Sequence, residues 1–376
     1  LIRGNTASHG GGGICVTWGA DAVINNTQVV SNSTAHEFGG GVSVAGVGTR
    51  ADIIDCLVAD NRGAEYGGAG IVIDWYSTAT LIGNEILSNT CPAGNDGGGG
   101  IRVNNYATAE INRNVLAHNR ADSGAGVKVT IDCHTVISGN QIVSNTARFG
   151  GGGVGVWQSD VTISHNTVSW NHARGAPALD LSHCTGTVDA NSIAHNEVGD
   201  WGSGGMSIGG GSSLTVSNNV VVSNVGTVAW WDGDGIAVWG DTTQARLVNN
   251  TIAFNSAEGV QTGGASTVLI RNNIIVGNGG GIHDLDSEAA IANDHNDVWN
   301  NGWANYANVL TGTSDISSNP LFVDPSNGDF HLQAGSPCID TGNDADAPRE
   351  DFEADLRPLD GDLDGTPVVD IGADEF

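Results

Sequence analysis

Two polar columns and one apolar column recur along most of the chain. An asparagine ends each repeat, another asparagine stands five residues earlier, and an aliphatic residue lies two positions after the earlier asparagine. The asparagine pairs are Asn84 and Asn89, Asn114 and Asn119, Asn140 and Asn145, Asn166 and Asn171, Asn191 and Asn196, Asn219 and Asn224, Asn250 and Asn255, and Asn273 and Asn278. The aliphatic position holds Ile86, Leu116, Ile142, Val168, Ile193, Val221, Ile252 and Ile275. In an earlier repeat we expect Asp55 and Asp60 to replace the asparagines.

The repeat has an elastic period. Successive later asparagines are separated by 30, 26, 26, 25, 28, 31 and 23 residues, and the length varies in the loop that follows them. A glycine-rich stretch then leads into an alternating strand such as 101–103, and a second alternating strand such as 161–163 leads back to the next asparagine. Each repeat therefore predicts about three short strands and no helix.

One such repeat cannot bury its apolar side alone. Stacking at about 4.8 Å per coil joins aliphatic to aliphatic and amide to amide, and asparagine tolerates the left-handed turn conformation. The pattern predicts an all-β right-handed parallel β-helix of about eleven coils. Hairpin sheets would not confine the length variation to one loop, and the period is too short for a propeller.

Composition agrees with short strands and turns. The chain has 57 glycines, one methionine and a formal net charge of −29. This charge repels nucleic acid and anionic membranes, and leaves cations and neutral glycans as partners. We find no apolar run long enough for a membrane span. Because Leu1 begins inside a repeat, we expect further coils and a secretion signal upstream.

The repeats resemble the bacterial right-handed parallel β-helix repeat family, which includes pectate-lyase-like enzymes, epimerases and surface proteins. The resemblance covers roughly residues 1–300 and implies the fold far more specifically than the function.

The last residues form a distinct acidic segment. Residues 311–376 hold sixteen acids and two arginines, and run from Asn319-Pro-Leu-Phe to Asp370-Ile-Gly-Ala-Asp-Glu-Phe. They resemble the choice-of-anchor module, type Q-like, that follows β-helices in bacterial surface proteins. We therefore expect a β-helix over 1–310, an acidic C-terminal cap over 311–376, and a location outside the cell or on its surface.

Alternate carboxylates in this segment are typical of a calcium loop. Asp360, Asp362 and Asp364 precede Gly365 as in the first half of an EF-hand-like loop, and Asp370 is the remaining candidate ligand. No cofactor is required by the sequence, and Ca²⁺ is a candidate. A solvated acidic turn is the alternative.

Charged residues gather on the outer side of the glycine-entered strands. Arg102 and Lys128 fall in one predicted outward column, with Asp180 two coils beyond Lys128, and Asp74, Asp96 and Asp122 near the same edge. A lyase or epimerase needs such a set, because carboxylates hold Ca²⁺ on a uronate while a basic side chain removes the C5 proton. A solvated face of balanced charges is the alternative.

Tryptophans and carboxylates suited to sugar rings lie further along. The candidate carbohydrate-binding residues are Trp157, Trp201, Trp230, Trp231, Asp232, Asp234 and Trp239. Asp232 and Asp234 also come nearest to the paired carboxylates of a glycoside hydrolase, although Asp-Gly-Ile is a common β-helix turn. Tryptophans buried under a long loop are the alternative.

Two functions remain open. We expect a secreted or cell-surface module that binds a polysaccharide or a cell-surface glycan without chemistry of its own. The alternative is a polysaccharide lyase or epimerase in which Lys128 and Arg102, with Asp180, act on a uronate.

Overall fold

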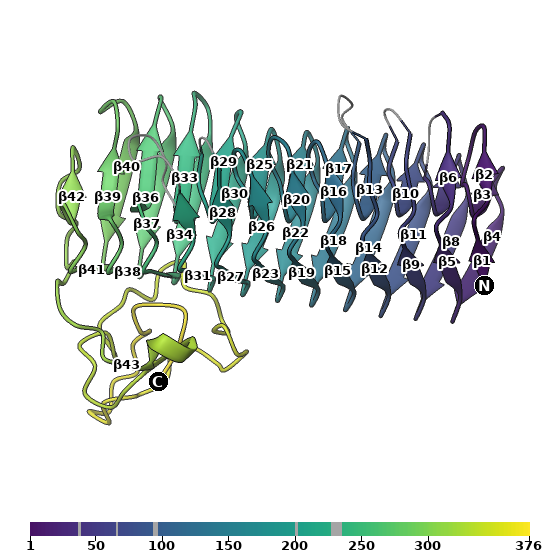
Figure 1. Ribbon diagram of the computed structural model, residues 1–376. Coiled ribbons are helices and arrows are strands. Elements are labelled where there is room, and N and C mark those ends of the chain that lie inside the picture. Colours follow the sequence, from purple (N-terminus) through teal and green to yellow (C-terminus); the bar gives the residue numbers. More distant parts are fainter. Residues whose placement is uncertain (37–38, 65–66, 93–96, 200–201, 227–234) are drawn as a thin grey trace. The chain divides into compact units, whose positions relative to one another are not determined.

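The computed structural model describes residues 1–36, 39–64, 67–92, 97–199, 202–226 and 235–376. The chain divides into two compact units. The first comprises Leu1–Thr185 with Asn196–Trp201, and the second comprises Gly186–His195 with Gly202–Phe376. In both units, short parallel strands from successive coils lie side by side (Figure 1).

The first unit contains three parallel sheets, whose strands appear in the order sheet 2, sheet 3, sheet 1 within each coil. Sheet 1 contains β1 (Ile2–Arg3), β5 (Gln28–Val30), β9 (Leu57–Ala59), β12 (Glu85–Leu87), β15 (Val115–Ala117), β19 (Gln141–Val143) and β23 (Thr167–Ser169). Sheet 2 contains β3 (Ile14–Thr17), β7 (Val42–Ala45), β10 (Ile71–Asp74), β13 (Ile101–Asn104), β17 (Val127–Thr130), β21 (Val154–Trp157) and β25 (Leu179–Ser182). Sheet 3 contains β4 (Asp21–Asn25), β8 (Arg50–Ile54), β11 (Thr78–Ile82), β14 (Thr108–Asn112), β18 (His134–Ser138) and β22 (Asp160–Ser164).

Short strands in the loop after the second asparagine pair separately. They are β16 (Arg120–Ala121), β20 (Thr146–Ala147), β24 (His172–Ala173) and β28 (Glu197–Val198), with β2 (Thr6–Ala7) and β6 (Ser33–Thr34) pairing in the first coils. We call this layer the loop sheet.

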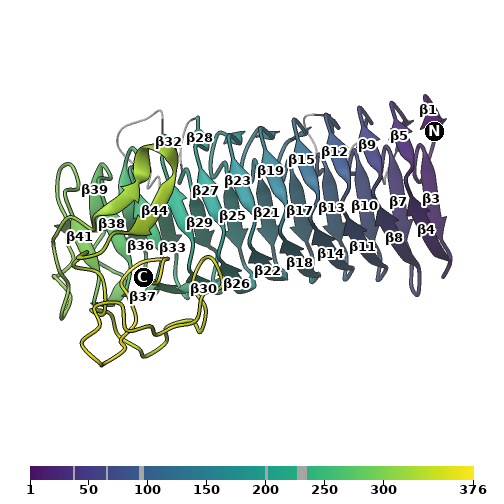
Figure 2. The same ribbon diagram turned by 90° about the horizontal axis from the view of Figure 1, so that it is seen from below.

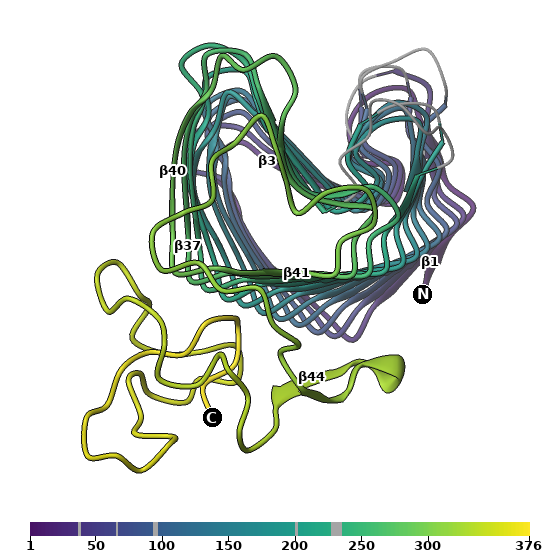
Figure 3. The same ribbon diagram turned by 90° about the vertical axis from the view of Figure 1, so that its left-hand side faces the viewer.

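The second unit repeats the scheme. Its sheet 1 contains β27 (Ser192–Ala194), β31 (Val220–Val222), β35 (Thr251–Ala253), β38 (Ile274–Val276) and β41 (Asp297–Trp299). Its sheet 2 contains β29 (Met206–Gly209), β33 (Ile236–Trp239), β36 (Glu258–Gly263), β39 (Gly280–Asp284) and β42 (Tyr306–Ala307). Its sheet 3 contains β30 (Ser213–Ser217), β34 (Gln244–Val248), β37 (Thr267–Arg271) and β40 (Ala290–Asp294); β26 (Thr185–Asp189) spans the unit boundary, and β32 (Val225–Gly226) lies in a loop. In Figure 3 the green coils of this unit wind one over another around a common interior.

The predicted β-helix is confirmed, and so are its columns. All eight residues of the aliphatic column are fully buried. Asparagine amides bond from coil to coil: Asn119 donates its backbone N–H and its Nδ2 to Oδ1 of Asn145, each at 3.0 Å. Asn145 in turn donates Nδ2 to the carbonyl of Leu116 at 2.9 Å. Each amide therefore satisfies backbone groups that the turn leaves without a strand partner.

Two details of the predicted ladder are wrong. Asn61, not Asp60, continues it, because Asn61 donates to Oδ1 of Asn89 at 3.0 Å, and Cys56, not Asp55, lies opposite Asn84. The left-handed residue is not the ladder asparagine but the one before it, as at Ser144, where φ is 56°. Asn145 itself has no positive φ, and its backbone N–H and Nδ2 bond to Oδ1 of Asn171 in the next coil.

The glycines before sheet 2 follow from this arrangement. A Cβ at Gly100 would lie 2.7 Å from the carbonyl oxygen of Gly126 and 3.1 Å from Nδ2 of Asn119. The chain therefore passes against the ladder and the next coil too closely for any side chain.

The C-terminal segment lies against sheet 1 of the second unit. Thr313 and Ile316 still pair with Asp294 and Asp297, so the stack continues slightly past residue 310. The antiparallel hairpin of β43 (Phe322–Asp324), the 3-10 turn η1 (Pro325–Asn327) and β44 (Asp329–Leu332) follows. Figure 2, seen from below, shows this hairpin in front of the sheet.

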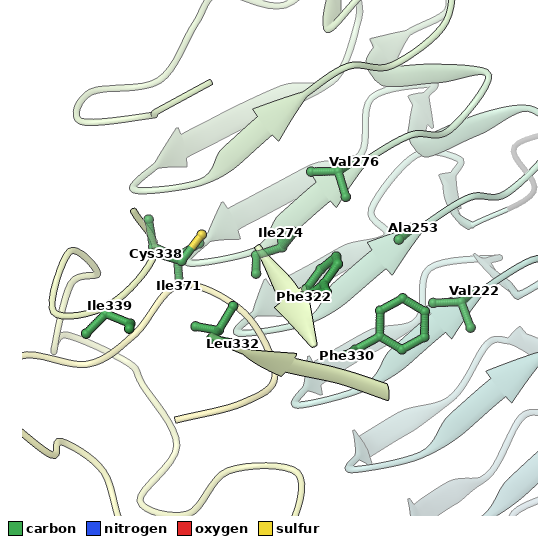
Figure 4. Packing of buried hydrophobic residues seen from close by; sticks show 10 residues of the cluster. All are labelled: Val222, Ala253, Ile274, Val276, Phe322, Phe330, Leu332, Cys338, Ile339 and Ile371. Carbon is green, nitrogen blue, oxygen red and sulfur yellow. The ribbon is translucent and has the colours of Figure 1, made fainter. Parts of the chain in front are cut away.

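An apolar cluster holds the segment there. Its members are Val222, Ala253, Ile274 and Val276 from sheet 1, and Phe322, Phe330, Leu332, Cys338, Ile339 and Ile371 from the segment (Figure 4). The segment thus begins beside the last strands, where Thr313 and Ile316 form bridges, and then covers the outer face of sheet 1. The apolar strand β38 is buried at all three positions as a result, and β31 at Val221 and Val222.

Removing one ladder amide should destabilise the fold strongly. Asn145→Ala leaves Asn119 and Leu116 with buried, unsatisfied backbone groups, so we expect a loss of about 2–4 kcal/mol in the free energy of unfolding. Asn112→Ala is the matched control, since Asn112 lies on the outer side of β14, and should change stability by less than about 0.5 kcal/mol. Equal effects in urea unfolding would contradict the ladder's role.

Candidate functional site

The predicted outward column of sheet 2 is confirmed in register. Arg102 pairs with Val72 and Lys128, Lys128 pairs with Gly155, and Gly155 pairs with Asp180. The column is not a solvated face, however: Arg102 is 8% exposed and Lys128 4% exposed. The interpretation of Lys128 as one charge of an open polar surface is therefore wrong.

The loops after the second asparagine cause this burial. In the first unit they carry the loop sheet and a small apolar cluster of their own, formed by Ala69, Cys91, Ala121, Ala125, Ala147 and Ala173. Alanine keeps this cluster thin, so the loops lie close beside sheet 2. The sequence shows these loops only as segments of variable length, and their packing against sheet 2 was not predicted.

A cavity of about 330 Å³ opens around the middle of the column. Its lining includes Ser123, Lys128, Gly155, Trp157 and Asp180. Gly155 contributes no side chain between Lys128 and Asp180, and a Cβ there would lie 3.3 Å from the backbone of Gly124 in the loop. Trp157 lines the cavity with 45% of its surface exposed. A cation, a carboxylate and an aromatic face therefore meet around one hollow.

The two charged residues of this cavity, Lys128 and Asp180, have different environments. Lys128 donates from Nζ to Oγ of Ser123 at 2.8 Å. Burial raises the pKa of Asp180 to about 6, and the charge of Lys128 offsets part of that effect. The carboxyl is thus poised to gain or lose a proton under mildly acidic conditions, and the lysine is fixed beside it.

Arg102 lies one rung away and is tied to the loop wall. Its Nη1 donates to the carbonyl of Gly67 at 3.4 Å. Asp74 accepts hydrogen bonds from Nδ2 of Asn105 at 2.9 Å and from the backbone of Trp75 at 2.8 Å, while burial raises its pKa. Asp74 and Asp122 are both buried, and Asp96 lies outside the described residues.

Most of the predicted tryptophan patch lies outside the described residues, namely Trp201, Trp230, Trp231, Asp232 and Asp234. Trp239 ends β33 in the second unit, and its ring covers Gly263 of the next rung. Trp157 is therefore the member of this set that the structure places in a cavity with charged residues.

The acids of the C-terminal segment do not converge as a set of four. Asp360 and Asp362 lie together with Asp340, which the spacing argument missed because it stands twenty residues earlier. Asp370 is buried and accepts the backbone N–H groups of Asp340 and Phe376, at 2.7 and 2.8 Å. Asp364 accepts the N–H of Thr366 in a local turn. Calcium binding by this loop stays a prediction.

Comparison with known proteins defines the class. A family model described as "Right handed beta helix region" matches residues 1–160 and 152–321, and the chain belongs to this family. The crystal structure of pectate lyase Pel9A is similar, with a TM-score of 0.53, 14% sequence identity, and coverage of 94% of this chain and 87% of that one. At this identity the likeness shows the fold alone. No curated protein matches the chain.

The family match ends at residue 321, so the choice-of-anchor resemblance of the C-terminal segment stays a prediction. Among the described residues there is no helix with the length and hydropathy that crossing a membrane requires.

The raised pKa of Asp180 predicts a pH-dependent stability. Because the folded state favours the protonated carboxyl, ionisation costs stability as pH rises from about 4 to 6. Asp180→Asn mimics the neutral acid, so at pH 7 we expect a gain of up to about 3 kcal/mol over the native chain, fading at pH 4. Urea unfolding at both pH values measures it. A difference that is the same at both would contradict the assignment.

Proposed function

We propose that this protein is a secreted or surface-held glycan-binding module, and that a glycan binds at the cavity beside Trp157 on sheet 2 of the first unit. The observation that carries the proposal is the meeting of Trp157, Lys128 and Asp180 around one cavity of about 330 Å³. An aromatic face stacks on a sugar ring, and charged groups beside it bond to hydroxyls.

The geometry favours binding at the cavity rather than along the whole sheet. The loops bury Arg102 and Lys128 on the preceding rungs, whereas Trp157 is 45% exposed. The exposed side of Trp157 is therefore available for stacking on a sugar ring. The net charge of −29 disfavours a polyanion at long range, so neutral polysaccharides are the first candidates.

Truncating the aromatic wall should weaken glycan binding. Trp157→Ala should raise Kd about ten- to hundredfold, because it removes roughly 1.5–3 kcal/mol of ring contact. Trp170→Ala is the matched control, since Trp170 is more exposed but sits in the turn between β23 and β24. Affinity electrophoresis in gels with xylan, galactan, alginate or polygalacturonate gives the readout. Retention on no polysaccharide, or equal loss in both variants, would refute the proposal.

A uronate lyase is the second candidate. The direct pairing of Arg102 with Lys128 in the register of sheet 2 favours it, because a base and a charge stabiliser stand on neighbouring rungs. Against it, Lys128 is buried and bonded to Ser123. In the described part of the chain, the residue groups able to hold a metal ion lie between residues 331 and 374, away from this column in the sequence.

Product absorbance separates the two functions. A lyase creates an unsaturated sugar that absorbs in the ultraviolet, whereas a binding module leaves the polymer intact. We expect no such absorbance with polygalacturonate or alginate plus Ca²⁺. Product that appears with the native chain and disappears in Lys128→Met would establish the lyase and replace the binding proposal.

A further inference from the structure

Three distant segments of the C-terminal region bring one histidine and two carboxylates together. His331 lies on β44, Glu353 in the loop that follows, and Asp374 two residues before the end of the chain. One ligand atom from each lies within 4.8 Å of the others. Phe330 and Leu332 turn toward sheet 1 in Figure 4, and strand alternation directs His331 to the other side.

The distances suit a metal ion. Nε2 of His331 lies 3.4 Å from Oε1 of Glu353 and 4.0 Å from Oδ1 of Asp374. Ligands bound tetrahedrally to one zinc ion at about 2.0–2.2 Å stand roughly 3.3–3.6 Å apart. The His331–Glu353 separation of 3.4 Å matches this spacing, and the His331–Asp374 separation of 4.0 Å has to shorten by roughly 0.5 Å when an ion binds.

Groups behind these atoms orient them. Nδ1 of His331 is bonded to Oδ1 of Asp329 at 2.6 Å, which leaves the lone pair of Nε2 facing the two carboxylates. The second oxygen of Asp374 accepts the N–H of Leu332 at 2.8 Å. A carboxylate behind a ligating histidine is the common supporting arrangement at protein metal sites.

The site has room for an ion, and the two carboxylates, Glu353 and Asp374, carry negative charge that an ion would balance. A cavity of about 110 Å³ lies here, and its walls include Val220, Phe330, Phe352 and Ala373 beside the three ligands. Glu353 also feels the negative charge of Asp351. An ion with its remaining waters fits this volume, and its two charges offset those of the two carboxylates.

We propose that His331, Glu353 and Asp374 bind one divalent transition-metal ion of the zinc class. One imidazole nitrogen with two carboxylate oxygens matches zinc better than calcium, which takes six to eight oxygens. The ion joins the hairpin, the following loop and the chain end, so its role is to hold the folded segment together. The site is separate from the Asp340, Asp360 and Asp362 cluster and independent of the proposed glycan binding.

Titration calorimetry of the chelator-treated full chain with zinc chloride tests the proposal. We expect one equivalent bound with a micromolar or lower Kd, and a higher melting temperature with zinc. His331→Gln should weaken this binding at least tenfold and abolish the visible absorption of the cobalt-substituted protein. Glu353→Gln provides a second test at another ligand, whose side chain is 37% exposed, in case His331→Gln perturbs folding.

Two control variants identify the site. His134→Gln removes an exposed histidine of the first unit that bonds to Asp160 at 2.7 Å in a similar His–carboxylate pair. Asp362→Asn alters the neighbouring acidic cluster. Both should retain the zinc equivalent. Absence of a one-equivalent site in the native chain, or undiminished zinc affinity in both His331→Gln and Glu353→Gln, would overturn the proposal.

Discussion

The hydrogen bond between an asparagine side chain and the same position one coil away is the constraint on which this structure depends. A parallel β-helix must turn its chain at every corner, and each turn leaves backbone groups buried without strand partners. Oδ1 of Asn166, for example, accepts the backbone N–H and the Nδ2 of Asn140, and Nδ2 of Asn140 also donates to the carbonyl of Ile111. The ladder thus fixes the register of sheets 1 to 3, because no coil can slip without breaking every amide contact.

Fixed corners allow the remaining loop to change freely. The loop after the second asparagine varies in length, yet in the first unit its alanine-rich core and short strands bring it beside sheet 2. The candidate site forms where this wall meets the sheet. Lys128 lies on strand β17, and Ser123 lies in the preceding loop. The strand therefore positions the lysine, and the hydrogen bond from the loop holds its ammonium group in place.

Periodicity predicted the regular part of the molecule well. The ladder, the aliphatic column and the pairing of Arg102, Lys128, Gly155 and Asp180 follow from repeat spacing, since stacking converts sequence offsets into neighbours. Burial of Lys128 did not follow, because it depends on how loops of unequal length fold back. Spacing also failed for Asp340 and for His331, whose partners come from distant segments without any repeat.

Two signals for the docking of the C-terminal segment were present but not recognised. Doubled asparagines occur at 218–219, 249–250 and 272–273; the second of each pair joins the ladder, and the first bonds to the segment. Strands β31 and β38 are apolar at all three positions, whereas most sheet-1 strands of the first unit mix polar and apolar residues. A strand whose outer face is also apolar indicates a covering layer.

The doubled asparagines attach the segment to three consecutive coils at once: Asn218 bonds to Glu350, Asn249 to Asp370 and Asn272 to Asn343. A solenoid normally frays from its last turn inward, one turn at a time, because each turn touches only its neighbours. Here the last coils cannot unfold one at a time, because the C-terminal segment is bonded to three of them. A pull on the C-terminus would accordingly be shared among several turns and resisted as a shear load.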